Sequence, residues 1–221
     1  MKLPYITLKS LTHIGTLDAA DKGVRGQSYE GPGVSVSDCP EAWEHIASLG
    51  GLSWWSLDPQ SVRLVDGHRL LEEQGDDLML WGLSNGLLEN APGFKGTFYD
   101  DEFECEMSFI KPTLEALQEE IDGVEDVKIE EIMTMPRATA KLIDLMQWKN
   151  YDVFDYTAMQ LLAQAYAREQ GEDGIWWEDQ LNEYMLSAPR GVLFPETMAR
   201  VQFVPFGELE APAAARPRAT S

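Results

Sequence analysis

The spacing of apolar residues predicts a chain that begins and ends in strands. Valines alternate with serines in residues 33–37, which places Val34 and Val36 on one face of a strand and Ser35 and Ser37 on the other. We expect further short strands within residues 5–17, 61–67, 175–177, 183–186, 192–194 and 201–204. Helical spacing predicts helices over residues 40–49, 112–121, 135–148 and 155–170. Residues 75–86 suit a strand or a helix, and glycine and proline predict loops at 22–32 and 87–99.

This order of elements indicates an α+β fold in which strands from the two ends of the chain pair with each other. We expect a single domain over residues 1–207, with a helical acidic section at about 99–150. The tail of residues 208–221 is rich in alanine and proline and lacks apolar periodicity, so it is predicted to be disordered.

Composition supports a packed, water-soluble protein. Hydrophobic residues make up 44% of the 221 residues, which is enough for a core. No apolar run approaches the roughly 18 residues that span a bilayer, and the N-terminus lacks the features of a signal peptide. We therefore expect a cytoplasmic protein that does not bind membranes. The two cysteines and three histidines lack metal-ligand spacing, so no metal site is expected.

Negative charge is the strongest compositional signal. The net charge of -21 opposes direct binding of nucleic acid and of anionic membranes. Between Asp100 and Glu131 lie thirteen acidic residues and only two lysines. Such a segment is either a solvated surface or a surface that binds a basic partner protein.

Several polar residues near the N-terminus are candidates for ligand binding. His13 and Thr16 can each hydrogen-bond a polar ligand, and Gly15 between them permits close approach of the backbone. Tyr29 lies among glycines, where its ring could stack on a flat ligand. Each of these residue types also serves purely structural roles, so the sequence leaves both interpretations open.

Four segments in a fixed order carry a resemblance to a known family. They are LTHIGT at 11–16, SYEGPGVSVS at 28–37, AYAREQGEDGIWW at 165–177 and GVLFPETMARVQF at 191–203. Their order resembles the ADP-ribosyltransferase-like fold of bacterial toxins and phage polyvalent proteins. The resemblance covers the two ends of the chain and leaves its middle unmatched.

The resemblance implies two small packed antiparallel sheets around a cleft that binds NAD as a substrate. The protein would transfer ADP-ribose to a macromolecular target, or hydrolyse NAD. His13, Gly15 and Thr16 would hold the ribose and nicotinamide side. The nicotinamide ring would lie against Tyr29 or the strand that carries Gly33, Ser35 and Ser37. A glutamate near the last strands would stabilise the oxocarbenium-like ribose. Glu183 is the first candidate for this glutamate, and Glu178 and Glu196 are its rivals. Tyr29 is a second catalytic candidate.

The sequence departs from the family pattern in two places. The His-Gly-Thr of the family is His-Ile-Gly-Thr here, with one residue inserted. Arg190 and Gly191 stand where the family commonly has a glutamate before the penultimate strand. The alternative interpretation is a non-enzymatic acidic protein, an inhibitor or nucleic-acid mimic of phage or mobile-element type, that binds a basic partner protein.

Overall fold

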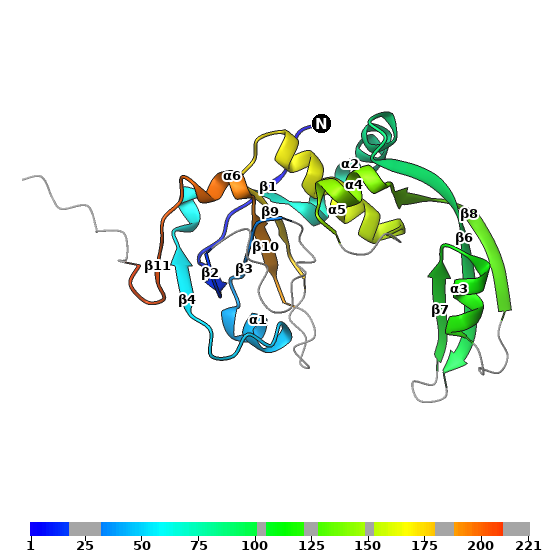
Figure 1. The fold of residues 1–221 in the computed structure, drawn as a ribbon, viewed down its shortest axis with the longest axis horizontal. Helices are drawn as coiled ribbons and strands as arrows, with labels where there is room; N and C mark the ends of the chain where they lie inside the picture. The colour runs from blue at the N-terminus through cyan, green and yellow to red at the C-terminus, as the bar shows by residue number, and fades with distance from the viewer. Residues whose placement is uncertain (18–31, 101–104, 122–127, 149–152, 180–187, 210–221) are drawn as a thin grey trace, which may run out of the picture. The chain divides into compact units, whose positions relative to one another are not determined.

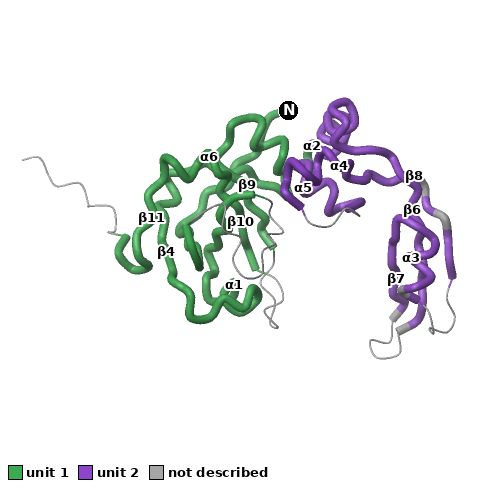
Figure 2. Tube along the Cα trace, in the orientation of Figure 1, with its two compact units in different colours: residues 1–73, 164–221 green, residues 74–163 purple. Residues whose placement is uncertain are grey.

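The computed structural model describes residues 1–17, 32–100, 105–121, 128–148, 153–179 and 188–209. The chain divides into two compact units (Figures 1 and 2), of which unit 1 comprises residues 1–73 and 164–221 and unit 2 comprises residues 74–163. The expectation of one domain over residues 1–207 stays a prediction, because compactness does not show how many parts fold independently. The predicted strand at 183–186 and the predicted tail beyond residue 209 lie outside the described residues.

Unit 1 is built from short strands and a few helices. They are β1 (Tyr5–Ile6), β2 (Leu11–Ile14), β3 (Val34–Val36), α1 (Pro40–Ile46), β4 (Trp54–Leu57), a 3-10 helix (Pro59–Ser61), β5 (Leu64–Asp66), the start of α2 (Gly67–Ser84), the end of α5 (Asp155–Glu169), β9 (Gly174–Trp177), β10 (Arg190–Leu193), α6 (Pro195–Met198) and β11 (Phe203–Pro205).

These strands form two sheets whose members come from both ends of the chain. One sheet has the order β1-β5-β9-β10-β3 and is antiparallel except for the parallel pair β5–β9, and the other has the order β11-β4-β2. The predicted alternation in residues 33–37 is confirmed, because Val34 and Val36 are buried. Val36 belongs to a core cluster with Leu11, Leu57, Leu64, Trp176 and Leu193. Burying each such side chain contributes about 1.5–3 kcal/mol, so this cluster fixes the pairing of the two chain ends.

Unit 2 contains the remaining elements of the chain. They are most of α2 and α5 together with β6 (Leu88–Asp100), β7 (Cys105–Lys111), α3 (Leu114–Glu120), β8 (Lys128–Ala138) and α4 (Ala140–Leu145). The strands form an antiparallel sheet of order β7-β6-β8. The prediction of a helical acidic section at about 99–150 is therefore wrong: the described residues of this section lie mainly in strands, with α3 and α4 as short helices.

Glycine and proline misled the interpretation of residues 87–99 as a loop, since these residues form most of β6. Gly96 lies in the strand because α3 packs closely on it, and a Cβ atom there would stand 2.9 Å from Cδ1 of Leu117. The register of β6 and β8 shifts between Ala91 and Gly93, which accommodates the irregular sequence around Pro92. The helix predicted at 135–148 begins only at Ala140, because Met135 to Ala138 pair with β6.

The other helix predictions are confirmed. The helix predicted at 112–121 is α3, where Thr113 Oγ1 accepts a hydrogen bond of 3.1 Å from the amide of Ala116. The helices predicted at 40–49 and 155–170 are α1 and α5, and residues 75–84 are helical as part of α2. The described chain is thus mixed α+β with small sheets and six helices, and none of its helices is long and apolar enough to cross a membrane.

Candidate functional site

The two sheets of unit 1 meet at a short contact between β2 and β3. Thr12 and Ser37 exchange two backbone hydrogen bonds of 2.8 and 2.9 Å in an isolated antiparallel bridge. The next hydrogen-bonded pair of such a ladder would be Ile14 with Ser35. The carbonyl oxygen of Ser35 instead lies 2.7 Å from Nδ1 of His13, so a side chain takes over where the ladder ends.

The ring of His13 lies between two backbone carbonyl groups. Its Nε2 is 2.7 Å from the carbonyl oxygen of Thr16, and the residue is only 8% exposed. A neutral imidazole has one N–H and can donate to only one of these carbonyls, whereas an imidazolium can donate to both. Burial lowers the pKa of His13, and this effect exceeds the opposite effect of the Ser35 and Thr16 carbonyls. The lowered pKa favours the neutral ring, which donates to one of these two carbonyls while its other nitrogen faces the second.

Gly15 and Gly33 both have a positive φ, but they serve different contacts. Gly15 has φ 130°; its amide donates to the carbonyl of Ser53, and its own carbonyl accepts a bond of 2.9 Å from Nε1 of Trp55. Gly33 has φ 139°, and a Cβ atom there would overlap the carbonyl oxygen of Leu193 in β10. The close approach at Gly33 is thus to a neighbouring strand.

Ser35, in β3, and Ser37, which forms the bridge beside it, also differ in burial and in their hydrogen bonds. Ser37 is fully buried; its hydroxyl donates to the carbonyl of Pro189 at 2.7 Å and accepts from the amide of Cys39 at 3.0 Å. These bonds use the Ser37 hydroxyl inside the protein. Ser35 is half-buried and its backbone carbonyl faces His13. The structure therefore brings together His13, Gly15, Thr16 and Ser35, while Gly33 and Ser37 serve strand packing.

Two of the predicted residues, Tyr29 and Glu183, lie outside the described residues. Of the rival glutamates, Glu196 lies in α6 and pairs with Arg168, which lowers the pKa of Glu196. Glu178 follows β9 and accepts a hydrogen bond of 2.6 Å from Nε1 of Trp176. Burial, and then the charge of Glu178, raise the pKa of Asp38, whose buried Oδ1 has no hydrogen-bond partner.

The same end of the five-stranded sheet carries further charged groups. The parallel pairing of β5 and β9 places the residues after both strands side by side. His68 Nε2 lies 3.1 Å from Oδ1 of Asp179, and Arg190 forms an ion pair with the same carboxylate. The residues that follow β3, β5 and β9 thus form a second cluster of titratable groups in unit 1, in addition to the surroundings of His13. Among the described residues, no group of three or more potential ligands is arranged to hold a metal ion.

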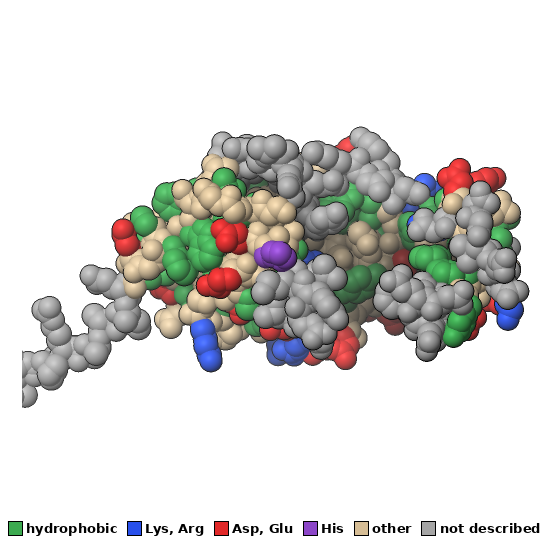
Figure 3. Space-filling model, turned by 90° about the horizontal axis from the view of Figure 1, so that it is seen from below, with side chains coloured by type: hydrophobic (Ala, Val, Ile, Leu, Met, Phe, Trp, Pro, Cys, Tyr) green, Lys and Arg blue, Asp and Glu red, His purple; other side chains and the backbone are tan. Residues whose placement is uncertain are grey.

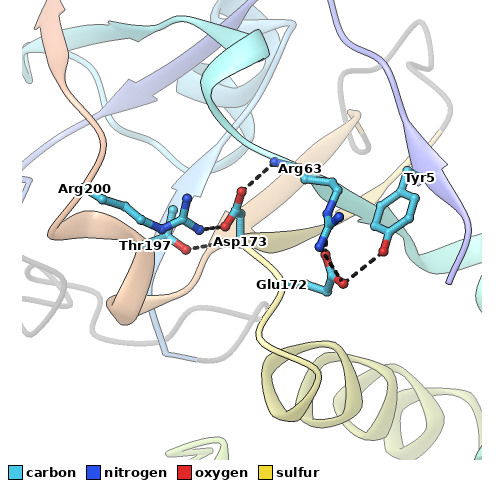
Figure 4. A network of polar contacts seen from close by, with 6 residues as sticks. All are labelled: Tyr5, Arg63, Glu172, Asp173, Thr197 and Arg200. Atoms are coloured by element: carbon cyan, nitrogen blue, oxygen red, sulfur yellow. Dashed lines mark hydrogen bonds and ion pairs between the residues drawn. The ribbon is translucent and has the colours of Figure 1, made fainter.

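Sequence reasoning missed a polar network at the opposite end of this sheet (Figure 4). Glu172 accepts two bonds from the guanidinium group of Arg63, of 2.8 and 3.1 Å, and one of 2.9 Å from the hydroxyl of Tyr5. Asp173 accepts a bond of 2.7 Å from the amide of Arg63 and forms an ion pair with Arg200. The backbone carbonyl of Asp173 also accepts a bond of 2.8 Å from the hydroxyl of Thr197.

This network explains the two acids of the GEDG segment. They tie the start of β9 to β1, to the residue before β5, and to the region of α6. The one local signal was a pair of adjacent acids directly before a buried strand.

No family model matches the chain, and comparisons with curated proteins and with solved structures return no match either.

Proposed function

We propose that unit 1 is an ADP-ribosyltransferase-like module that binds NAD as a substrate. The supporting observation is the arrangement of the four motif segments, which are far apart in the sequence. β2 bridges to β3, β3 pairs with β10, and β10 pairs with β9. The motifs thus form one row of neighbouring strands, and the unmatched middle of the chain belongs largely to unit 2.

Within this proposal, His13 is a positioning residue. Its buried ring packs between the backbone carbonyls of Thr16 and Ser35 and donates a hydrogen bond to one of them, so it helps to position these two residues. The hydroxyl groups of these two residues are of the kind that recognises a ribose or a carboxamide. Gly15 keeps the backbone between His13 and Thr16 in a conformation that other residues rarely adopt.

The proposed reaction breaks the bond between the ribose C1′ and the nicotinamide nitrogen. The electron pair leaves with nicotinamide, and the positively charged ribose is attacked by a nucleophile of the target, or by water, which then loses a proton. A carboxylate beside the ribose would stabilise this charge. Glu183 and Glu178 both follow β9 in the sequence and are the candidates for this role.

Nicotinamide release from NAD tests this proposal, with purified wild-type protein and three variants. Glu183→Gln or Glu178→Gln should lower the rate at least about 100-fold, because loss of one group that stabilises transition-state charge has an effect of that size. Glu196→Gln is the matched control, since Glu196 forms an exposed ion pair with Arg168. Equal rates in all four proteins, or no release by the wild type at millimolar NAD, would contradict the enzymatic proposal.

A second proposed function belongs to unit 2, which would bind a basic partner protein. Residues 74–163 contain 19 acidic and 6 basic residues, so unit 2 carries most of the negative charge. The described acids of the acidic segment include Glu106, Glu115, Glu119 and Glu130, all exposed. They lie on both the sheet and α3, and Figure 3 shows acidic side chains at several separate places on the face it draws. The described acids thus form no phosphate-like stripe, and the support for this second function is the net charge of unit 2.

A further inference from the structure

The two outer edges of the unit 2 sheet differ. The outer edge of β8 is covered at its end, where Arg137 bridges to Phe154 and the amide of Ala138 donates to the carbonyl of Val153 at 2.7 Å. β8 also contains Pro136, which cannot donate to an added strand. By contrast, no strand within the described part of the chain pairs with the outer edge of β7.

β7 has a charged residue, Lys111, at its end, but its central part lacks the proline and bulges by which many edge strands are protected. Its seven residues pair with β6 in an unbroken register from Phe94 with Lys111 to Asp100 with Cys105. The strand contains no proline and no glycine, and no bulge interrupts it. Protected edges commonly carry proline or bulges within the strand. The central part of β7, from Glu106 to Ile110, is therefore suited to accept another strand.

The register assigns the side chains of β7 to two different faces. Phe109 lies opposite Gly96, whose free side faces Leu117 of α3, so Phe109 is on the face that α3 covers. Phe109 also stacks on Phe98 with ring centroids 5.2 Å apart. Alternation places Glu106, Ser108 and Ile110 on the other face. An added strand would therefore meet an aromatic face and a partly acidic face.

We propose that β7 is a docking edge for an extended, basic segment of a partner protein, which adds to the sheet as a fourth strand. This inference rests on the second proposed function, because the charge of unit 2 supplies the attraction. Backbone hydrogen bonds would provide the affinity of strand addition, and side-chain pairs its selectivity. The partner segment would place lysine or arginine beside Glu106 and apolar residues beside Phe109.

Titration of the full-length, isotope-labelled protein with an acetylated heptapeptide of alternating lysine and valine tests the proposal by NMR. We expect chemical-shift changes and slowed amide exchange in Glu106 to Ile110. The same peptide with every backbone amide methylated keeps its charge but has no backbone N–H to donate to β7, so its binding to these residues should be lost. Glu106→Lys should weaken binding of the first peptide about two- to fivefold, the effect of one cross-strand charge pair.

A proline placed in β7, as in Ser108→Pro, would also block an added strand but could unfold the sheet. The methylated peptide avoids this difficulty because it tests backbone pairing on the wild-type protein. Equal binding of both peptides would overturn strand addition and leave only charge attraction. Binding that maps away from β7 would overturn this docking edge but leave the second proposed function standing. No binding of either peptide at millimolar concentration would overturn both. Concentration-dependent pairing of β7 with a second copy of the chain, without peptide, would also overturn the proposal.

Discussion

Replacement of Glu172 by glutamine probes the polar network that joins the strands of unit 1. The side chain of Glu172 is 5% exposed, whereas that of Arg63 is 61% exposed. The carboxylate accepts three hydrogen bonds, two from Arg63 and one from Tyr5. Glu172→Gln keeps the size of the side chain and removes its charge, so it weakens these bonds without opening a cavity.

The asymmetry in burial sets the expected magnitude. A bond to a charged group contributes about 1.5–3 kcal/mol, and a glutamine oxygen retains part of that. Arg63 can return to water after the substitution, so no buried charge is left behind. We expect Glu172→Gln to lower the free energy of unfolding by about 2 kcal/mol. Arg63→Met should cost more, about 3 kcal/mol, because the carboxylate then stays buried with only Tyr5.

Urea unfolding followed by tryptophan fluorescence measures these effects, since Trp176 and Trp177 are buried in β9 of unit 1. The matched control is Glu196→Gln, which breaks an ion pair whose glutamate is 63% exposed and should cost less than about 1 kcal/mol. The reasoning is refuted if Glu172→Gln lies within about 0.5 kcal/mol of the wild type, or if Arg63→Met costs less than Glu172→Gln.

Three further predictions concern β2 and β3. Gly33→Ala should lower the free energy of unfolding by about 3 kcal/mol, and Gly15→Ala should lower it by about 1–2 kcal/mol. Both glycines have a positive φ, but only at Gly33 would the added Cβ atom overlap a carbonyl oxygen. Thermal unfolding of the two variants measures the difference. Burial lowers the pKa of His13, so the unfolded state binds more protons below about pH 6.5. The wild type should therefore lose stability from pH 7 to 5 relative to His13→Gln, and a relative gain in urea midpoint would contradict this. Burial, and then Glu178, raise the pKa of Asp38, which makes its ionised form unfavourable in the folded state. Asp38→Asn should raise the urea midpoint at pH 7, and this gain should shrink as the pH falls below about 4, where Asp38 becomes protonated in both the folded and the unfolded state.

Local periodicity predicted the elements whose packing is regular. The valine–serine alternation of β3 and the apolar face of α5 were visible in the sequence because burial imposes a period on neighbouring residues. The same approach failed for β6, where Gly96 makes room for Leu117, a residue 21 positions further along the chain. A glycine required by such a contact looks the same in the sequence as a glycine in a loop.

The candidate site shows a similar division. The sequence indicated His13, Gly15, Thr16 and Ser35, and the structure brings them together. The sequence could not show that both ring nitrogens of His13 face backbone carbonyls, because that contact depends on where β2 and β3 separate. Glu172 was equally hidden, since its partner Arg63 is 109 positions away and the chain has 38 acidic residues.

Calorimetric titration of NAD into the purified protein, repeated with His13→Ala and Tyr29→Ala, tests the central claim most directly. We predict saturable binding by the wild type that is lost or strongly weakened in both variants. Circular dichroism of the variants distinguishes loss of the site from loss of the fold. Absence of binding by the wild type at millimolar NAD, or unchanged binding in both folded variants, would contradict the assignment of unit 1 as an NAD-binding module.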